Sequence, residues 1–174
     1  INDVFQTPDT ENNTGKNYKF SVPQESEAAG LFLEGNLIEE NGGFISCRSP
    51  FLTSPLDLSP FSGMQIEVDG KGRTLKFAVT CGDLVTRVSE SFSGGVKWVA
   101  ELATKDIGTT LVKIPFNKFE PSIRAKPILL PTKFASNSIV QFQLLYSKFG
   151  IAGKLNSDFI PGPFSILLRS ISAF

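Results

Sequence analysis

Alternation of apolar and polar residues is the feature of this sequence that most restricts its fold. Apolar side chains recur at every second position through five segments, residues 18–22, 64–69, 74–79, 140–146 and 164–169. Period two is the repeat of a β-strand with one face in a core and the other nearer water. A weaker form of the pattern occurs at residues 31–38, 44–48, 96–102 and 110–114. We therefore predict about nine strands, separated by Gly, Pro, Asn and Ser.

The same pattern argues against helices. No window of eleven residues has apolar residues at helical spacing, and prolines recur too evenly between residues 50 and 131 for long helices. Strands without intervening helices form antiparallel sheets, so the predicted fold class is all-β, a two-sheet antiparallel β-sandwich. At 174 residues the chain suits a single domain over residues 1–174. We expect the space between the sheets to be filled by Phe20, Ile66, Phe77, Phe142, Leu144 and Ile166.

Three polar or glycine-rich segments are expected to connect these strands. Residues 6–16 are polar and predict a mobile loop. Residues 68–73 join two alternating runs through a glycine-bearing turn, which is a hairpin signal. Residues 118–137 contain several prolines and predict a long connection, either a crossover between sheets or a functional loop.

The absence of histidine removes most catalytic arrangements. Without it, Ser-His-Asp and Cys-His nucleophiles and the common His-based zinc and iron sites are excluded. Glu39-Glu40 is typical of a surface turn, and Gly70-Lys71-Gly72 lacks both the third glycine and the following helix of a nucleotide-binding loop. We therefore predict a protein that is not an enzyme, with no catalytic residue, metal, cofactor or small-molecule substrate.

Charge and cysteine usage restrict the partners and the compartment. The formal net charge is zero, so no long-range field favours nucleic acid or anionic lipid. No apolar run approaches the roughly 20 residues of a membrane-spanning helix. Cys47 and Cys81 show no C-x-x-C spacing, which favours free buried thiols in a reducing compartment.

Two features are candidates for partner binding. The sequence has a local excess of positive charge in the predicted connection, at Lys118, Arg124, Lys126 and Lys133. This stretch indicates either a solvated loop or a docking surface. Trp98 lies in an alternating run, which is typical of a core residue, although an exposed anchor for a partner or a sugar fits as well.

Five segments in this order resemble the complex I intermediate-associated protein family. The segments are residues 41–49 (NGGFISCRS), 57–63 (DLSPFSG), 68–73 (VDGKGR), 114–119 (IPFNKF) and 162–166 (GPFSI). The run IPFNKF resembles the family's I-P-F-x-x-F closely, and we expect Phe116 and Phe119 to pack into or beside the core. Residues 143–156 are similar to the plant, algal and cyanobacterial branch.

The resemblance implies a fold and a role. It implies a galactose-binding-domain-like jelly roll without established catalytic residues, as in assembly factors of respiratory complex I and their photosynthetic relatives. We expect a protein-binding assembly factor or chaperone whose partners are subunits of an organellar, energy-converting membrane complex. A plastid location is favoured over a mitochondrial one, with any targeting peptide outside this chain. The alternatives are a permanent structural or linker subunit of a photosynthetic supercomplex and a carbohydrate-binding module.

Overall fold

The computed structural model describes residues 18–21, 30–39, 43–82, 95–123, 126–128 and 133–174. These residues form strands and two short 3-10 helices. In chain order the elements are β1 Tyr18–Ser21, β2 Leu31–Leu37, β3 Phe44–Arg48, β4 Gly63–Asp69, β5 Thr74–Cys81, β6 Lys97–Ala103, β7 Thr110–Pro115, η2 Phe116–Lys118, β8 Glu120–Ile123, β9 Lys126–Pro127, β10 Ile139–Ser147, η3 Ile151–Gly153 and β11 Gly162–Ala173. All nine predicted strands are present.

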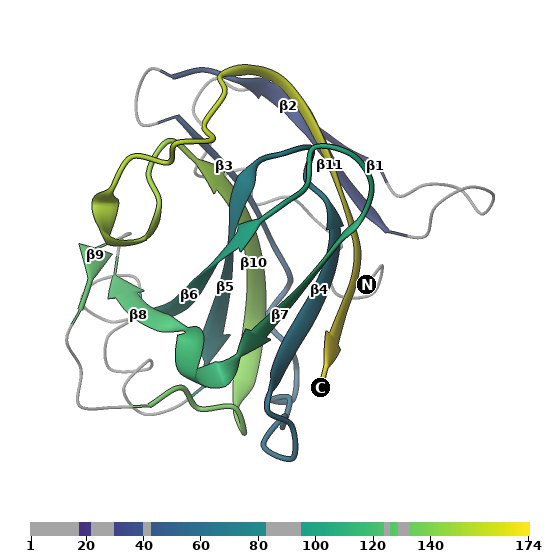
Figure 1. Ribbon diagram of the computed structural model, residues 1–174. Coiled ribbons are helices and arrows are strands. Elements are labelled where there is room, and N and C mark those ends of the chain that lie inside the picture. The colour runs from purple at the N-terminus through teal and green to yellow at the C-terminus, as the bar shows by residue number, and fades with distance from the viewer. Residues whose placement is uncertain (1–17, 22–29, 40–42, 83–94, 124–125, 129–132) are drawn as a thin grey trace.

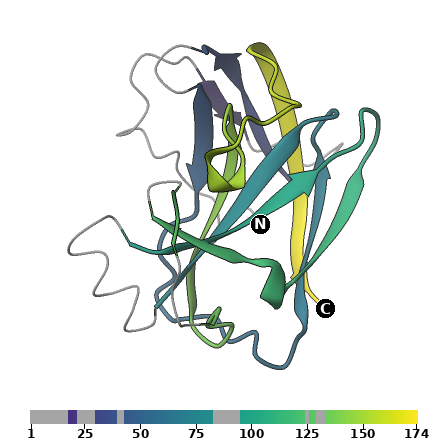
Figure 2. The same cartoon turned by 60° about the vertical axis from the view of Figure 1, so that its left-hand side comes forward.

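Two antiparallel sheets face each other. The five-stranded sheet has the order β1-β2-β11-β4-β7, and the six-stranded sheet has the order β3-β10-β5-β6-β8-β9. Figure 1 shows β4 and β11 on one side of the molecule and β5, β6 and β10 on the other, and Figure 2 gives a second view of the same layers. The prediction of a two-sheet antiparallel β-sandwich is confirmed.

The alternating residues fill the space between the sheets. Leu75, Phe77, Val79 and Cys81 of β5 are all fully buried, and the ring of Phe77 stacks on Phe142 of β10 with centroids 5.8 Å apart. Ile66, Leu144 and Ile166 are buried as predicted, as are Phe77 and Phe142 themselves. The side chain of Phe20 and the predicted loop at residues 6–16 lie outside what the structure describes.

The predicted hairpin at residues 68–73 is wrong. The turn itself is tight, with positive φ at Lys71 and Gly72 and a 3.2 Å bond from the Arg73 N–H to the Gly70 carbonyl. However, β4 pairs with β7 and β11, whereas β5 pairs with β6 and β10. The turn therefore carries the chain from one sheet to the other. Local sequence specifies a reversal of direction, but the pairing of each strand is decided by distant residues.

The predicted long connection at residues 118–137 is more regular than expected. It contains β8, which pairs with β6, and the two-residue strand β9, which pairs with β8. Pro121 and Pro127 argue against strands at these positions, so β8 and β9 were not predicted from the sequence. Such prolines are tolerated because β8 is short and β9 is the edge of its sheet.

An aromatic cluster fixes the end of this connection to the core. The ring of Phe134 stacks on Phe119 and on Phe116, with centroid separations of 5.0 and 5.2 Å. Its edge also meets the indole of Trp98 at 5.7 Å. Phe119 is buried in the core and Phe116 packs against it, so the prediction for both residues of the IPFNKF run is confirmed.

Candidate binding face

The outer face of the six-stranded sheet is polar but largely covered. Alternation on β5 and β10 directs Lys76, Thr80, Gln141 and Gln143 away from the core, yet each is less than a tenth exposed. The amine of Lys97 on β6 donates to the hydroxyl of Thr80 on β5 at 2.7 Å, so side chains of these two neighbouring strands are hydrogen-bonded on this face. A sheet face that is polar and yet withdrawn from solvent is unusual for an unpartnered surface.

Residues 148–160, here called the covering loop, cross this face between β10 and β11. The amine of Lys76 donates to the Phe149 carbonyl at 2.6 Å, and the Ile151 N–H donates to a carboxylate oxygen of Glu101 at 2.7 Å. The side-chain amide of Asn156 donates to the Thr74 carbonyl at 2.9 Å and to the Ser147 carbonyl at 3.1 Å. The loop is therefore held to the scaffold by hydrogen bonds spread over its length.

Tyr146 anchors the far end of the covering loop. Its ring is fully buried in the core, and its hydroxyl donates to the Asp158 carbonyl at 3.0 Å. The same oxygen accepts the Ile160 N–H at 2.7 Å. One core residue thus satisfies two backbone groups of a surface segment, which fixes the position of that segment relative to the sheets.

Burial affects the pKa of the lysine beneath the loop. The pKa of Lys76 is lowered, chiefly because its amine is withdrawn from water, and the nearby negative charge of Glu101 opposes this shift. Lys76 and Glu101 are directly paired across β5 and β6. The carboxylate of Glu101 therefore interacts with both the buried lysine and the backbone of the loop.

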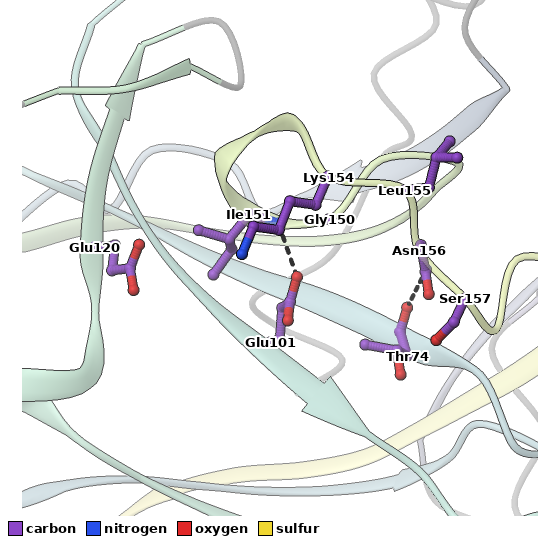
Figure 3. Close-up of a pocket in the computed structure, with 9 residues that line it drawn as sticks. All are labelled: Thr74, Glu101, Glu120, Gly150, Ile151, Lys154, Leu155, Asn156 and Ser157. Carbon is purple, nitrogen blue, oxygen red and sulfur yellow. Dashed lines mark hydrogen bonds between the residues drawn. The ribbon is translucent and has the colours of Figure 1, made fainter.

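A pocket of about 380 Å³ opens where the covering loop meets the sheet. Its sheet side carries Thr74, Glu101 and Glu120, and Figure 3 shows the loop residues arranged around the opposite side. The loop contributes Gly150, Ile151, Lys154, Leu155, Asn156 and Ser157. The pocket thus combines two carboxylates and one amine with two branched apolar side chains.

The covering loop also carries exposed apolar residues. Leu155 is 70% exposed and Ile160 is 57% exposed, and Phe149 is also exposed. All three side chains project from the covering loop, whose backbone is fixed by the hydrogen bonds given above. Exposed apolar groups on an ordered segment are typical of a protein interaction site.

The residues predicted for partner binding separate into two groups. Trp98 is only 4% exposed, so it is a core residue and is not available as an exposed anchor. Lys118, Lys126 and Lys133 are exposed, and Lys133 makes a further interaction of its own. Lys126 belongs to β9, which lies beside η3 of the covering loop. Arg124 lies outside the described residues.

Sequence reasoning missed the acidic side of this pocket. Glu101 and Glu120 are 19 positions apart, and only the pairing of β6 with β8 brings them to one face. Because β8 was not predicted, no pattern in the sequence joined the two carboxylates. The available signal was the β6 alternation, which puts Glu101 on the face opposite the core residue Trp98.

Both cysteines are buried thiols that form no disulfide, as predicted. Cys47 lies opposite Leu144 of β10, whereas Cys81 lies opposite Ile139. Five residues of strand separate these positions, or about 16 Å, which is far beyond the reach of a disulfide. Burial raises the pKa of Cys47 to about 12, so the thiol stays protonated in the folded protein.

We expect Cys47 to resist alkylation until the protein unfolds, because the thiolate is the reactive form. Iodoacetamide at pH 8 followed by mass spectrometry should find Cys47 unmodified in the native protein and modified in urea. Its folded pKa lies above its ordinary value of 9.0, so the folded state retains the proton longer than the unfolded state. Stability from this group is therefore complete below pH 9 and falls as pH rises toward 12. Modification of Cys47 in the native protein would contradict its burial.

The described residues show neither a metal-binding cluster nor a membrane-spanning helix. The described part of the chain contains no group of three or more histidine, cysteine or acidic residues that could hold a metal ion. Over the same residues, no helix has the length and apolar character needed to cross a bilayer.

Comparison with solved structures identifies the architecture. The fold is similar to the family 11 carbohydrate-binding module of a cellulosomal cellulase of Clostridium thermocellum, with a TM-score of 0.57 and 12% identity over 93% of this chain and 84% of that one. The Clostridium thermocellum module in complex with a β-1,3-1,4-mixed-linked tetrasaccharide gives a TM-score of 0.58 and 14% identity, over 93% and 85% of the two chains. At these identities the likeness establishes the jelly-roll fold alone.

Comparison with sequences identifies the family. No curated protein matches the chain. The family model described as complex I intermediate-associated protein 30 (CIA30) matches residues 15–168, which include β1 to β10, the covering loop and the first part of β11. Since this match spans most of the sequence, the chain belongs to the CIA30 family.

Proposed function

We propose that this domain binds protein subunits during the assembly of respiratory complex I, or of a related photosynthetic complex, and catalyses no reaction. The observation that carries the proposal is the family match over residues 15–168. The structure supports it with a rigid scaffold and an ordered, partly apolar surface segment. Such an arrangement suits recognition of another protein, because loops on a rigid scaffold commonly carry binding residues.

The covering loop is the proposed contact surface. Its exposed Leu155 and Ile160 would bury apolar area against a partner, and burial of such area is the main driving force for protein association. Their backbone is already fixed by Tyr146 and Asn156, so docking would require little rearrangement. A plastid location is the finer part of the proposal, supported by the likeness of residues 143–156 to the plant and algal branch.

Carbohydrate binding is the competing function that the fold suggests. A relative in fold forms a complex with a tetrasaccharide. In this chain the only tryptophan is buried in the core, where it meets Phe134. Of the aromatic residues, Phe149 of the covering loop is exposed close to the candidate face, but it is not among the residues that line the pocket. The described residues therefore favour protein binding.

Affinity purification tests the proposed function. The tagged chain, mixed with solubilised plastid and mitochondrial membranes, is expected to enrich subunits of one energy-converting complex, identified by mass spectrometry. The double variant Leu155→Ser, Ile160→Ser should lose this enrichment with an unchanged melting temperature, because both side chains are exposed. Ile107→Ser is the matched control, since Ile107 is 89% exposed on the turn between β6 and β7. Equal capture by all three proteins would remove the covering loop from the proposal.

The basic stretch is tested in the same purification. If Lys118 and Lys126 dock a partner, replacing both with serine should weaken capture without changing folding. The loss should be greater at low salt, because exposed charges are screened over about 8 Å at physiological ionic strength. Unchanged recovery at two salt concentrations would identify this stretch as a solvated surface.

A further inference from the structure

Two carboxylates line the pocket from neighbouring strands. Glu120 of β8 lies opposite Val99 of β6, and Glu101 is two residues further along β6 on the same face. The Cα atoms of diagonal neighbours of this kind are about 7–8 Å apart. The Ile151 N–H orients the Glu101 carboxylate through one of its oxygens. Among the described residues, the Glu120 carboxylate has neither a hydrogen-bond nor an ion-pair partner.

The covering loop adds apolar residues to the pocket lining. Ile151 and Leu155 are among the residues that line the pocket from the covering loop. In Figure 3 the Ile151 side chain lies on the side of the two carboxylates, whereas the Leu155 side chain points away from them. The volume of about 380 Å³ lies near the lower end of the roughly 300–1,000 Å³ typical of ligand sites. A site of this size suits one long side chain with an apolar stem and a charged end.

Lys154 already places a cation in this pocket. Figure 3 shows its side chain folded along the loop, with the amine on the side of the pocket that holds Glu101 and Glu120. In the described part of the chain no ion pair joins Lys154 to either carboxylate. An exposed lysine without direct pairing contributes little binding energy, so a better-fitting cation can displace it.

We propose that the pocket receives one arginine side chain of the partner protein, which displaces the Lys154 amine. The planar guanidinium presents five N–H donors and can reach two separated carboxylates, whereas an ammonium is a compact charge. The stem of the arginine would lie against Ile151. This inference rests on the proposed function, since it names the chemistry that the same face recognises in its partner.

Amide shifts in NMR spectra of the whole ¹⁵N-labelled chain test the pocket without the partner. The probe is N-acetyl-L-arginine amide, and N-acetyl-L-norleucine amide is the neutral analogue. The Ile151 N–H is the reporter, because its hydrogen bond ends on the Glu101 carboxylate. We expect saturable shifts at Ile151 with the arginine probe and none with the norleucine probe.

Two variants should change the affinity for the probe in opposite directions. Glu120→Gln removes one charge at an exposed position. It should weaken binding of the arginine probe by about threefold or more, which is the change in affinity expected when a partly exposed charge pair is lost. Lys154→Met keeps the apolar stem, removes the competing amine and should strengthen binding. Lys105→Met, an exposed lysine on the turn after β6, is the matched control and should leave the affinity unchanged.

The outcomes separate this inference from the proposed function. Absence of saturable shifts with the arginine probe, or equal shifts with norleucine, would overturn the arginine pocket even if subunit capture persists. Shifts at Ile151 caused instead by a mixed-linked β-glucan tetrasaccharide would overturn it in favour of a sugar site. Binding of the arginine probe that weakens in Glu120→Gln and strengthens in Lys154→Met would support it, whichever complex supplies the partner.

Discussion

Replacing Phe119 with alanine is expected to lower the free energy of unfolding by about 3–5 kcal/mol, the usual loss for a buried phenylalanine. Its side chain is buried in the core and its ring stacks on Phe134. Removing the ring would leave a cavity at the point where Phe134 fixes the end of the 118–137 connection. Urea unfolding followed by tryptophan fluorescence measures the change, because Trp98 meets the same Phe134 ring.

A matched aromatic residue on the surface is the control for this variant. Phe51 is 57% exposed, so Phe51→Ala should change stability by no more than about 0.5 kcal/mol. Phe116→Ala should give an intermediate loss, because Phe116 is only partly buried. A Phe119→Ala protein with native stability and no subunit capture would show that the IPFNKF run is a binding anchor and that its assignment to the core is wrong.

Replacing Gly63 with alanine is expected to destabilise the fold by about 3 kcal/mol through overpacking. An added Cβ would meet the Ile114 carbonyl oxygen well inside van der Waals contact and would lie 2.8 Å from the Cα of Pro115. Both are backbone atoms of β7, which pairs with β4 at this point. Neither can move aside without disturbing the sheet, and the ring of Phe174 blocks the remaining direction at 2.8 Å.

Thermal unfolding of Gly63→Ala and Ser62→Ala provides the comparison. Ser62 precedes Gly63 and is exposed, so its variant should unfold at the wild-type temperature. The two positions share hydrogen bonds from their backbone N–H groups to the Phe174 carbonyl, which neither substitution removes. Equal melting temperatures for the two variants would show that β7 can shift to accept a methyl group.

Strand positions could be predicted because each alternating run specifies its own period. Residues 44–48 were predicted as a strand and form β3 with the same bounds. The pairing of strands could not be predicted in the same way. The turn at Gly70-Lys71-Gly72 has the geometry of a hairpin, yet its two strands enter different sheets, because β11 and β7 take both edges of β4. Those contacts join residues 42 to 109 positions apart.

The candidate face was largely beyond sequence reasoning. Alternation predicts that Gln141 and Gln143 face water, but both are buried on the outer face of the six-stranded sheet. The covering loop contains no pattern that shows where it lies, because its position depends on single hydrogen bonds from Lys76, Asn156 and Tyr146. The lysines of the basic stretch were recognised by charge alone, and this signal did not reveal the carboxylates beside them.

The hydroxyl of Tyr146 has a consequence for the thermodynamics of association. By bonding to Asp158 and Ile160 it orders the covering loop when the domain folds, before any partner arrives. The conformational entropy of these residues is therefore lost during folding. Binding of a partner then does not include the entropic cost of ordering the loop. A partner would then meet a preformed surface, and its affinity would be set by how slowly it dissociates from that surface.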